Sequence, residues 1–288
     1  DVSRDPRWGR IAESFGEDPY LTSVLGVASI RGFQGDDLSR PGAIAACAKH
    51  FAGYGASEGG RDYGYVGIPE IDVRNVYLPP FKAAVDAGVA TFMAAFSDVN
   101  GVPASGNRLL MQTVLRDEWK FPGFVVSDWE SIIDMIVHGF AASEKDAAFE
   151  ALSAGVDMEM ASTTFRDHLP DLLAEKRIEQ ATLDTAVRNV LRVKFQLGLF
   201  ERTVTDPSRY PAVASAADLA STSRAWRGRP FFPCVGLGSS SCRSGPIANS
   251  DAGFDRHSNA FAICIATMEA KTIVDRNCLS FFFNDTAT

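Results

Sequence analysis

The sequence lacks several features that would place it in a functional class at once. Its 288 residues contain no run of eighteen or more apolar residues, so no membrane-spanning helix is predicted. Basic residues are outnumbered by acidic ones, 28 against 36, and the net charge of −8 argues against a nucleic-acid partner, which needs a basic face. No secretory signal pattern is found in the residues given. The remaining composition, 46% hydrophobic and 22% charged, is that of an ordinary globular protein.

Cysteine is nearly absent from the first two hundred residues, where Cys47 stands alone. The other four cysteines follow after position 230. None of the five belongs to a CxxC or HxxxH pattern, so the spacing gives no support to a metal site. We predict neither a metal nor another cofactor. The four late cysteines leave a disulfide framework open as one interpretation.

Between residues 18 and 200 the chain alternates between helix-like and strand-like segments. The helix-like ones are 18–33, 73–88, 107–120, 143–155, 165–176 and 181–198, and the strand-like ones are 43–51, 89–96, 123–129 and 156–161. Asp18 with Pro19, Asn107 and Thr182 are expected helix starts, and Gly155 and Gly198 are expected helix ends. The strands are apolar throughout, as in a parallel sheet that is covered on both faces.

Alternation of this kind predicts parallel βαβ units and an α/β fold. Two architectures fit: an open doubly wound sheet, or a (β/α)8 TIM-type barrel of which only part is present. The sequence starts at Asp1 without a Met and within what reads as a strand. We therefore expect an incomplete barrel that is missing its first strands.

The chain is expected to divide near residue 205. Residues 1–205 form the α/β domain, and residues 206–288 form a tail rich in Ser, Gly, Pro and Cys that ends in FFFNDTAT. Two interpretations of the tail stay open. It is either a disordered extension, or the product of a frame shift or assembly artefact, because its ending resembles translated adapter sequence.

Polar residues stand where the predicted strands end. Lys49 and His50 follow the strand AIAACA, and Asp128 and Trp129 follow GFVVS. In parallel α/β folds, functional groups collect at the carboxyl ends of the strands. A carboxylate, two cationic or hydrogen-bonding groups and an indole suit a hydroxyl-rich substrate such as a sugar.

Three motifs carry a family resemblance. The stretches RDPRWGRIAESFGEDP (4–19), AKHFAGYGASEGGRDY (48–63) and FPGFVVSDWESI (121–132) occur in the order found in glycoside hydrolase family 3. They resemble most its bacterial periplasmic β-glucosidase branch, and the resemblance covers about residues 1–205. It implies a retaining exo-β-glycosidase, most specifically a β-glucosidase, that acts on β-linked oligosaccharides or glucosides in the periplasm or outside the cell.

The resemblance also implies residue roles. Asp128 is the expected nucleophile. The expected substrate-binding residues are Arg10, Lys49, His50, Met93 and Trp129. A nucleophilic carboxylate must be ionised, and we expect Arg10, Lys49 and His50 to supply a positive or hydrogen-bonding environment. Other interpretations of single residues remain: Arg10 pairing with Glu13 or Glu17, Met93 and Trp129 as core, and Asp62 as a loop residue or a partner of Lys49.

Two departures from the family pattern affect function. Phe96 and Ser97 stand where many relatives have Tyr-Asn after the methionine. Family β-glucosidases usually take the acid/base residue from a second domain, and we assign no such residue in this chain. Accordingly we also consider an inactive fragment or degenerate relative, and a Schiff-base lyase that uses Lys49.

Overall fold

The computed structural model describes residues 1–204. A four-stranded parallel sheet forms its centre, made of β1 (Cys47–Phe51), β2 (Thr91–Ala94), β5 (Phe124–Trp129) and β6 (Met158–Met160). A short antiparallel pair, β3 (Asp98–Val99) and β4 (Val102–Pro103), follows β2. The predicted tail from 206 and its domain assignment lie outside the described residues.

Helices separate the strands along the chain. They are α1 (Pro19–Gln34), α2 (Glu70–Asp72), α3 (Pro79–Asp86), α4 (Asp134–Val137), α5 (Glu144–Ala154), α6 (Thr164–Ala174) and α7 (Gln180–Gln196). Two segments are π-helical, η4 (Val73–Tyr77) and η6 (Leu109–Glu118), and four are single 3-10 turns, η1 (Ile11–Glu13), η2 (Tyr54–Ala56), η3 (Glu58–Gly60) and η5 (Ala104–Gly106).

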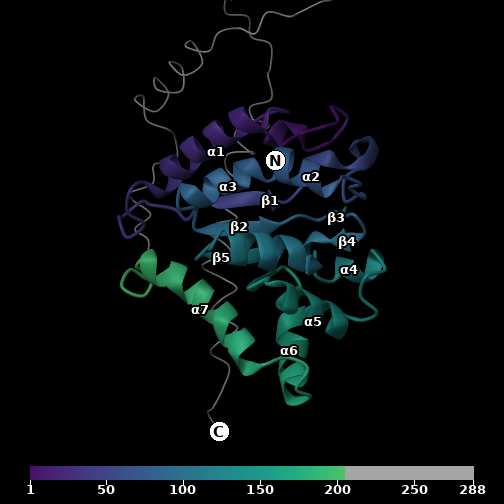
Figure 1. The fold of residues 1–288 in the computed structure, drawn as a ribbon. Helices are drawn as coiled ribbons and strands as arrows, with labels where there is room; N and C mark the ends of the chain where they lie inside the picture. The colour runs from purple at the N-terminus through teal and green to yellow at the C-terminus, as the bar shows by residue number, and fades with distance from the viewer. Residues whose placement is uncertain (205–288) are drawn as a thin grey trace, which may run out of the picture. The chain divides into compact units, whose positions relative to one another are not determined.

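The strand order identifies the architecture. The sheet runs β1-β2-β5-β6, which is the order of the strands in the sequence, and every neighbouring pair is parallel. A doubly wound sheet would reverse its direction of growth at a switch point, whereas a (β/α)8 barrel adds each strand beside the previous one. Figure 1 shows α1 and α3 side by side along β1 and β2, and α5 beside α6. The described strands therefore form an arc of a barrel-type sheet, as predicted.

Alternate residues of each strand divide the apolar core in two. Phe92, Ala94 and Val125 pack on one face of the sheet with residues of α1, α3, η6 and α5. On the opposite face lie Met93, Phe124, Val126, Met158 and Met160, which pack with Val190, Val193 and Leu197 of α7. Side chains of a strand alternate between its two faces, so a strand covered on both sides must be apolar throughout.

Capping residues predicted from the sequence mark the ends of several helices. The Asp18 carboxylate accepts hydrogen bonds from the amides of Tyr20 and Leu21 at the start of α1. Gly155 ends α5 with a φ of 115°, which favours glycine. The prediction for Thr182 was wrong: α7 begins at Gln180 and no side chain caps it.

The helix expected over 73–88 is present but consists of two parts: the π-helical turn η4, which directly follows α2, and the α-helix α3, with a bend at Leu78 between them. The Pro79–Pro80 pair opens α3, where its missing amide hydrogens cost nothing. The Asn107 side chain accepts from the Leu110 amide at 3.2 Å as expected, although the following helix is π-type.

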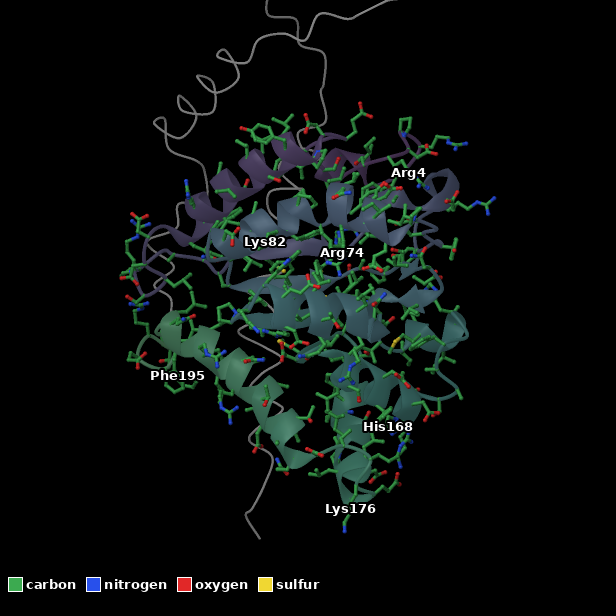
Figure 2. The ribbon with its side chains drawn as sticks, viewed as in Figure 1. Arg4, Arg74, Lys82, His168, Lys176 and Phe195 are labelled. Atoms are coloured by element: carbon green, nitrogen blue, oxygen red, sulfur yellow. The ribbon has the colours of Figure 1, made fainter. Side chains whose placement is uncertain are left out.

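Charged side chains lie on the outer, solvent-exposed sides of the helices. Figure 2 shows Arg74 and Lys82 among them; Arg74 pairs with Glu70 and Glu118, and Lys82 pairs with Asp86. Exposed pairs of this kind contribute little to stability. Within residues 1–204, no helix has the length and apolar character needed to cross a bilayer.

Candidate active site

The predicted polar residues meet at the carboxyl end of the sheet. Lys49 and His50 lie in β1, and Asp128 and Trp129 end β5, with β2 between the two strands. His50 Nε2 lies 3.4 Å from Asp128 Oδ2, and Arg10 and Lys49 are near enough for their charges to act on the Asp128 carboxylate. In the sequence they are spread over more than a hundred positions.

A shift in strand register turns His50 toward Asp128. The pairing of β1 with β2 is regular at Cys47 and Ala48 and then shifts before Phe51. Strict alternation from Ala48 would place His50 on the same face of the sheet as Ala48 and Phe92. Instead it is Phe51 that packs on this face, with Phe92. His50 Nε2 lies 3.4 Å from Oδ2 of Asp128.

His50 is held from its other side by Asp1, a residue that the sequence analysis did not single out. Asp1 Oδ2 lies 2.9 Å from His50 Nδ1, and Asp1 Oδ1 accepts a hydrogen bond from the His50 backbone amide at 3.2 Å. The carboxylate therefore favours the tautomer that carries its proton on Nδ1, which leaves Nε2 facing Asp128. No motif marks Asp1, because its role depends on a residue 49 positions away.

Asp128 and His50 are both buried, with exposed fractions of 7% and 1%. One oxygen of Asp128, Oδ1, accepts from the Trp129 amide at 2.7 Å. The other, Oδ2, and His50 Nε2 face each other without hydrogen-bond geometry, and neither atom has a hydrogen-bond partner in the described part of the chain. Buried polar atoms are normally hydrogen-bonded, so this unpaired couple is characteristic of a functional site.

Burial disfavours the charged form of both groups. Desolvation raises the pKa of Asp128, opposed by His50, the Trp129 amide and Arg10. Desolvation also lowers the pKa of His50 to about 3, although the charge of Asp128 opposes it. At neutral pH His50 is therefore a neutral hydrogen-bonding group, so the positive charge around Asp128 comes from Arg10 and Lys49. Of the two contributions expected from His50, positive charge or hydrogen bonding, a neutral ring can make only the second.

Arg10 contacts two residues, Glu13 and Tyr54. Its guanidinium pairs with Glu13, Nε to Oε1 at 2.8 Å and Nη2 to Oε2 at 2.7 Å, as one of the interpretations foresaw. It also lies over the ring of Tyr54, with Cζ 5.4 Å from the ring centroid. The pairing with Glu13 does not remove Arg10 from the site, since its charge still acts on Asp128 and His50.

Tyr54 is a second residue of the site that the sequence motifs did not single out. It is fully buried and lies edge-to-face with His50, at 5.1 Å between ring centroids, and with Trp8, at 5.2 Å. Its hydroxyl donates to Asp62. Asp62 therefore contacts Tyr54, and also Trp8, at the edge of the site.

Trp129 and Met93 differ strongly in solvent exposure. Trp129 is 61% exposed, so it is not core, and its indole is available to an incoming molecule. Met93 is 2% exposed and packs with Val126 and Phe124 in the core. A cavity of about 270 Å³ is lined by Met93 and Lys49 and also by Asp1 and Glu13, but not by Asp128 or His50. The role of Met93 as a sugar contact stays a prediction.

Phe96 and Ser97 line the neighbouring strand end. Phe96 packs against Tyr54 and, at 4.5 Å between centroids, against Tyr63. It therefore presents an aromatic face without the hydroxyl that a tyrosine would offer. The Ser97 hydroxyl is buried and has no hydrogen bond among the described residues. Within the same residues, no group of three His, Cys, Asp or Glu side chains is arranged to hold a metal ion.

Comparisons with known proteins show the family of the chain. The family model for the glycosyl hydrolase family 3 N terminal domain matches residues 1–193. A periplasmic beta-glucosidase of Salmonella typhimurium is 46% identical over 200 residues, covering 69% of this chain and 26% of that protein. A putative beta-xylosidase of Formosa agariphila is 42% identical over 210 residues, covering 72% and 28%.

Solved structures give the same family. A beta-glucosidase from Listeria innocua superposes with a TM-score of 0.76 at 41% identity, covering 78% of this chain and 32% of that chain. The same enzyme has been solved in complex with glucose and, as a mutant, with laminaribiose. The present chain thus spans about a quarter to a third of the length of the relatives that it matches. By sequence and fold, the chain belongs to glycosyl hydrolase family 3, and residues 1–193 match that family's N-terminal domain.

Proposed function

We propose that this chain carries the nucleophile half of a retaining, exo-acting β-glycosidase, most specifically a β-glucosidase. The observation that supports the proposal most directly is the Asp128 carboxylate. It is buried at the end of β5, held by the Trp129 amide, and faces His50 within the positive field of Arg10 and Lys49. This is the place where a barrel enzyme carries its chemistry.

In the proposed reaction, Asp128 attacks the anomeric carbon and the glycosidic oxygen leaves as an alcohol after it is protonated. Water then hydrolyses the glycosyl–aspartyl ester and regenerates the carboxylate. Lys49, His50 and Arg10 bind the hydroxyls of the terminal sugar, and Trp129 covers its apolar face. The facing atoms Asp128 Oδ2 and His50 Nε2 are both buried and have no hydrogen-bond partner among the described residues, which supports a role for them in binding a polar substrate.

Retaining hydrolysis requires a second carboxyl group about 5–5.5 Å from the nucleophile, on the other side of the scissile bond. Asp1 does not fit this role, since it lies on the far side of the His50 ring and is bound to it. We assign the proton donor to no residue of 1–204. In keeping with this, we propose that the isolated chain turns over slowly, because loss of general acid catalysis commonly costs about 10²–10⁴-fold.

The relatives support the substrate class more firmly than the sugar. The Listeria enzyme was solved with glucose and laminaribiose, and the Salmonella relative is named a periplasmic beta-glucosidase. These support a β-glucoside substrate and a periplasmic location for this protein. The Formosa relative favours β-xylosidase as a second candidate. A rate comparison between aryl β-glucoside and aryl β-xyloside decides between the two.

The test is covalent trapping. A 2-deoxy-2-fluoro-β-glucosyl fluoride is incubated with the protein, and the labelled peptide is identified by mass spectrometry. We expect one sugar on Asp128, and no label in Asp128→Asn. Labelling elsewhere, or hydrolysis unchanged in Asp128→Asn, would rule out this assignment. Borohydride reduction with a small keto acid tests the Schiff-base alternative, which requires an adduct on Lys49.

A further inference from the structure

We infer that Asp62 is a positioning residue of this site, which orients His50 and Arg10 through Tyr54. Its Oδ1 atom accepts the hydroxyl hydrogen of Tyr54 and lies 3.4 Å from Trp8 Nε1, which donates to it. Asp62 thus joins the loop that follows β1 to the segment that carries Arg10. The inference rests on the proposed function, because it concerns how the sugar-binding residues are held.

Tyr54 transmits the effect. Its ring contacts His50 edge-to-face at 5.1 Å and 79°, and the Arg10 guanidinium lies over it at 5.4 Å. The hydroxyl is the one polar atom of a side chain with an exposed fraction of 0%, and a buried hydroxyl needs a partner. Asp62 accepts its hydrogen, and the Arg10 side chain is hydrogen-bonded to the same hydroxyl. If Asp62 is removed, the hydroxyl loses its carboxylate acceptor, and we expect the ring to shift against His50 and Arg10.

The contact between Trp8 and Asp62 is one of several between two segments, residues 4–10 and residues 55–62. The Arg4 amide donates to the Gly55 carbonyl at 2.9 Å, and the Arg4 side chain, labelled in Figure 2, pairs with Glu58 at 3.0 Å. A Cβ at Gly60 would lie 2.7 Å from the Trp8 backbone nitrogen, so glycine is needed for this close approach. Arg10 follows Trp8 by two residues, and its position therefore depends on this docking.

Asp62 is exposed, whereas the residues that it holds are buried. A change at Asp62 therefore leaves the core intact, and an effect on the site can be separated from an effect on folding. The environment of Tyr54 agrees with a permanent donor: burial, followed by the hydrogen bond to Asp62, raises the pKa of its hydroxyl well above the ordinary value. The hydroxyl stays protonated and keeps donating over the whole working range of pH.

The first measurement is kinetic. Asp62→Ala, Tyr54→Phe and the double variant are assayed on an aryl β-glucoside in the protein expressed from its whole gene. The matched controls are Asp72→Ala and Tyr65→Phe, which remove an exposed carboxylate and an exposed hydroxyl. We expect Asp62→Ala to lower kcat/KM by about 10–100-fold, as for small misplacements of binding groups. Asp62→Asn, which keeps an acceptor oxygen, should recover most of the loss.

The double variant tests whether Asp62 acts on the site through Tyr54. If Asp62 acts through Tyr54, the double variant loses no more than the worse single variant. Asp62→Ala leaves the buried Tyr54 hydroxyl without its carboxylate acceptor, so its thermal midpoint is measured beside that of Asp72→Ala, and kinetics are compared at a temperature where both are folded. Full additivity, or an Asp62→Ala enzyme as active as Asp72→Ala, contradicts the inference.

The second measurement does not depend on activity. The chain has four histidines, so the ring signals of ¹⁵N-histidine-labelled protein are few, and His50→Gln identifies that of His50. We expect the His50 signal to move in Asp62→Ala and to stay in Asp72→Ala. An unmoved signal overturns the inference even in an inactive protein. If the His50 signal moves in Asp62→Ala but the wild-type protein hydrolyses no glycoside, the inference about Asp62 stands. Only the proposed function is then ruled out.

Discussion

His50 lies between two buried carboxylates, with Nε2 3.4 Å from Asp128 Oδ2 and Nδ1 2.9 Å from Asp1 Oδ2. The Asp1 contact fixes the ring and its tautomer, and the Asp128 contact is the one that chemistry can use. Because His50 has a pKa of about 3, it remains neutral and binds by hydrogen bonding. The positive charge that favours an ionised nucleophile comes instead from Arg10 and Lys49.

Removal of the Asp1 carboxylate should weaken the site through His50. In Asp1→Ala the Nδ1 hydrogen loses its acceptor, which costs about 1–3 kcal/mol for a buried donor, or roughly 5–150-fold in kcat/KM. Asp1→Asn keeps an acceptor oxygen and should lose less. Steady-state kinetics of both variants measures the effect. Equal activity of Asp1→Ala and wild type would show that the contact has no role in catalysis.

Activity should fall on the acidic side at a pH above the ordinary titration range of aspartate. The pKa of Asp128 is raised by burial, and only its ionised form attacks. As the pH falls through this raised pKa, the carboxylate takes up a proton and turnover stops. The acid limb of the kcat/KM profile of the free enzyme should therefore lie above about pH 3.9. A limb at or below that value contradicts the raised pKa.

Replacement of Trp129 should affect binding more than stability. The indole is 61% exposed, so Trp129→Ala removes little packing. Loss of a stacking surface for the sugar should raise KM by about threefold to tenfold, in line with the roughly 0.5–1.5 kcal/mol of an aromatic contact. Trp129→Phe, which keeps a ring, is the control. A lower thermal midpoint with unchanged KM would instead assign Trp129 a packing role.

Asp157 should be required for folding. It lies at the opposite end of the strands from the site, where it accepts from Arg116 at 2.5 Å, from the Val125 amide at 2.7 Å and from Asn189 at 2.9 Å. Asp157→Ala leaves the buried Arg116 guanidinium without its counter-charge, which typically costs about 3–5 kcal/mol.

Urea unfolding measures this cost, with the exposed Asp184→Ala as its control. A change within about 0.5 kcal/mol, as at ordinary surface sites, would show that Arg116 finds other partners. Its bonds to the Phe121 and Gly123 carbonyls, at 2.8 and 2.7 Å, are the candidates.

Secondary structure was predictable wherever one local signal dominated. Asp18 before Pro19 and Gly155 after α5 each act within a few residues, so their effect is visible in the sequence. The π-helical turns η4 and η6 were not predicted, because an apolar stripe does not distinguish one helix type from another. The β3–β4 pair was missed because two residues per strand give no period to detect.

By itself, the sequence determined the parallel α/β class, the positions of the four strands and the chemical types that end them: Lys49, His50, Asp128 and Trp129. Strand-end residues can be read in this way because apolar runs and turn residues are local properties. Only the tertiary structure decided which side chains meet. The register shift in β1 turns His50 toward Asp128, Asp1 contacts His50 from 49 positions away, and Asp62 contacts Trp8 from 54 positions away. Such contacts depend on how strands pair and loops dock, which no local pattern encodes.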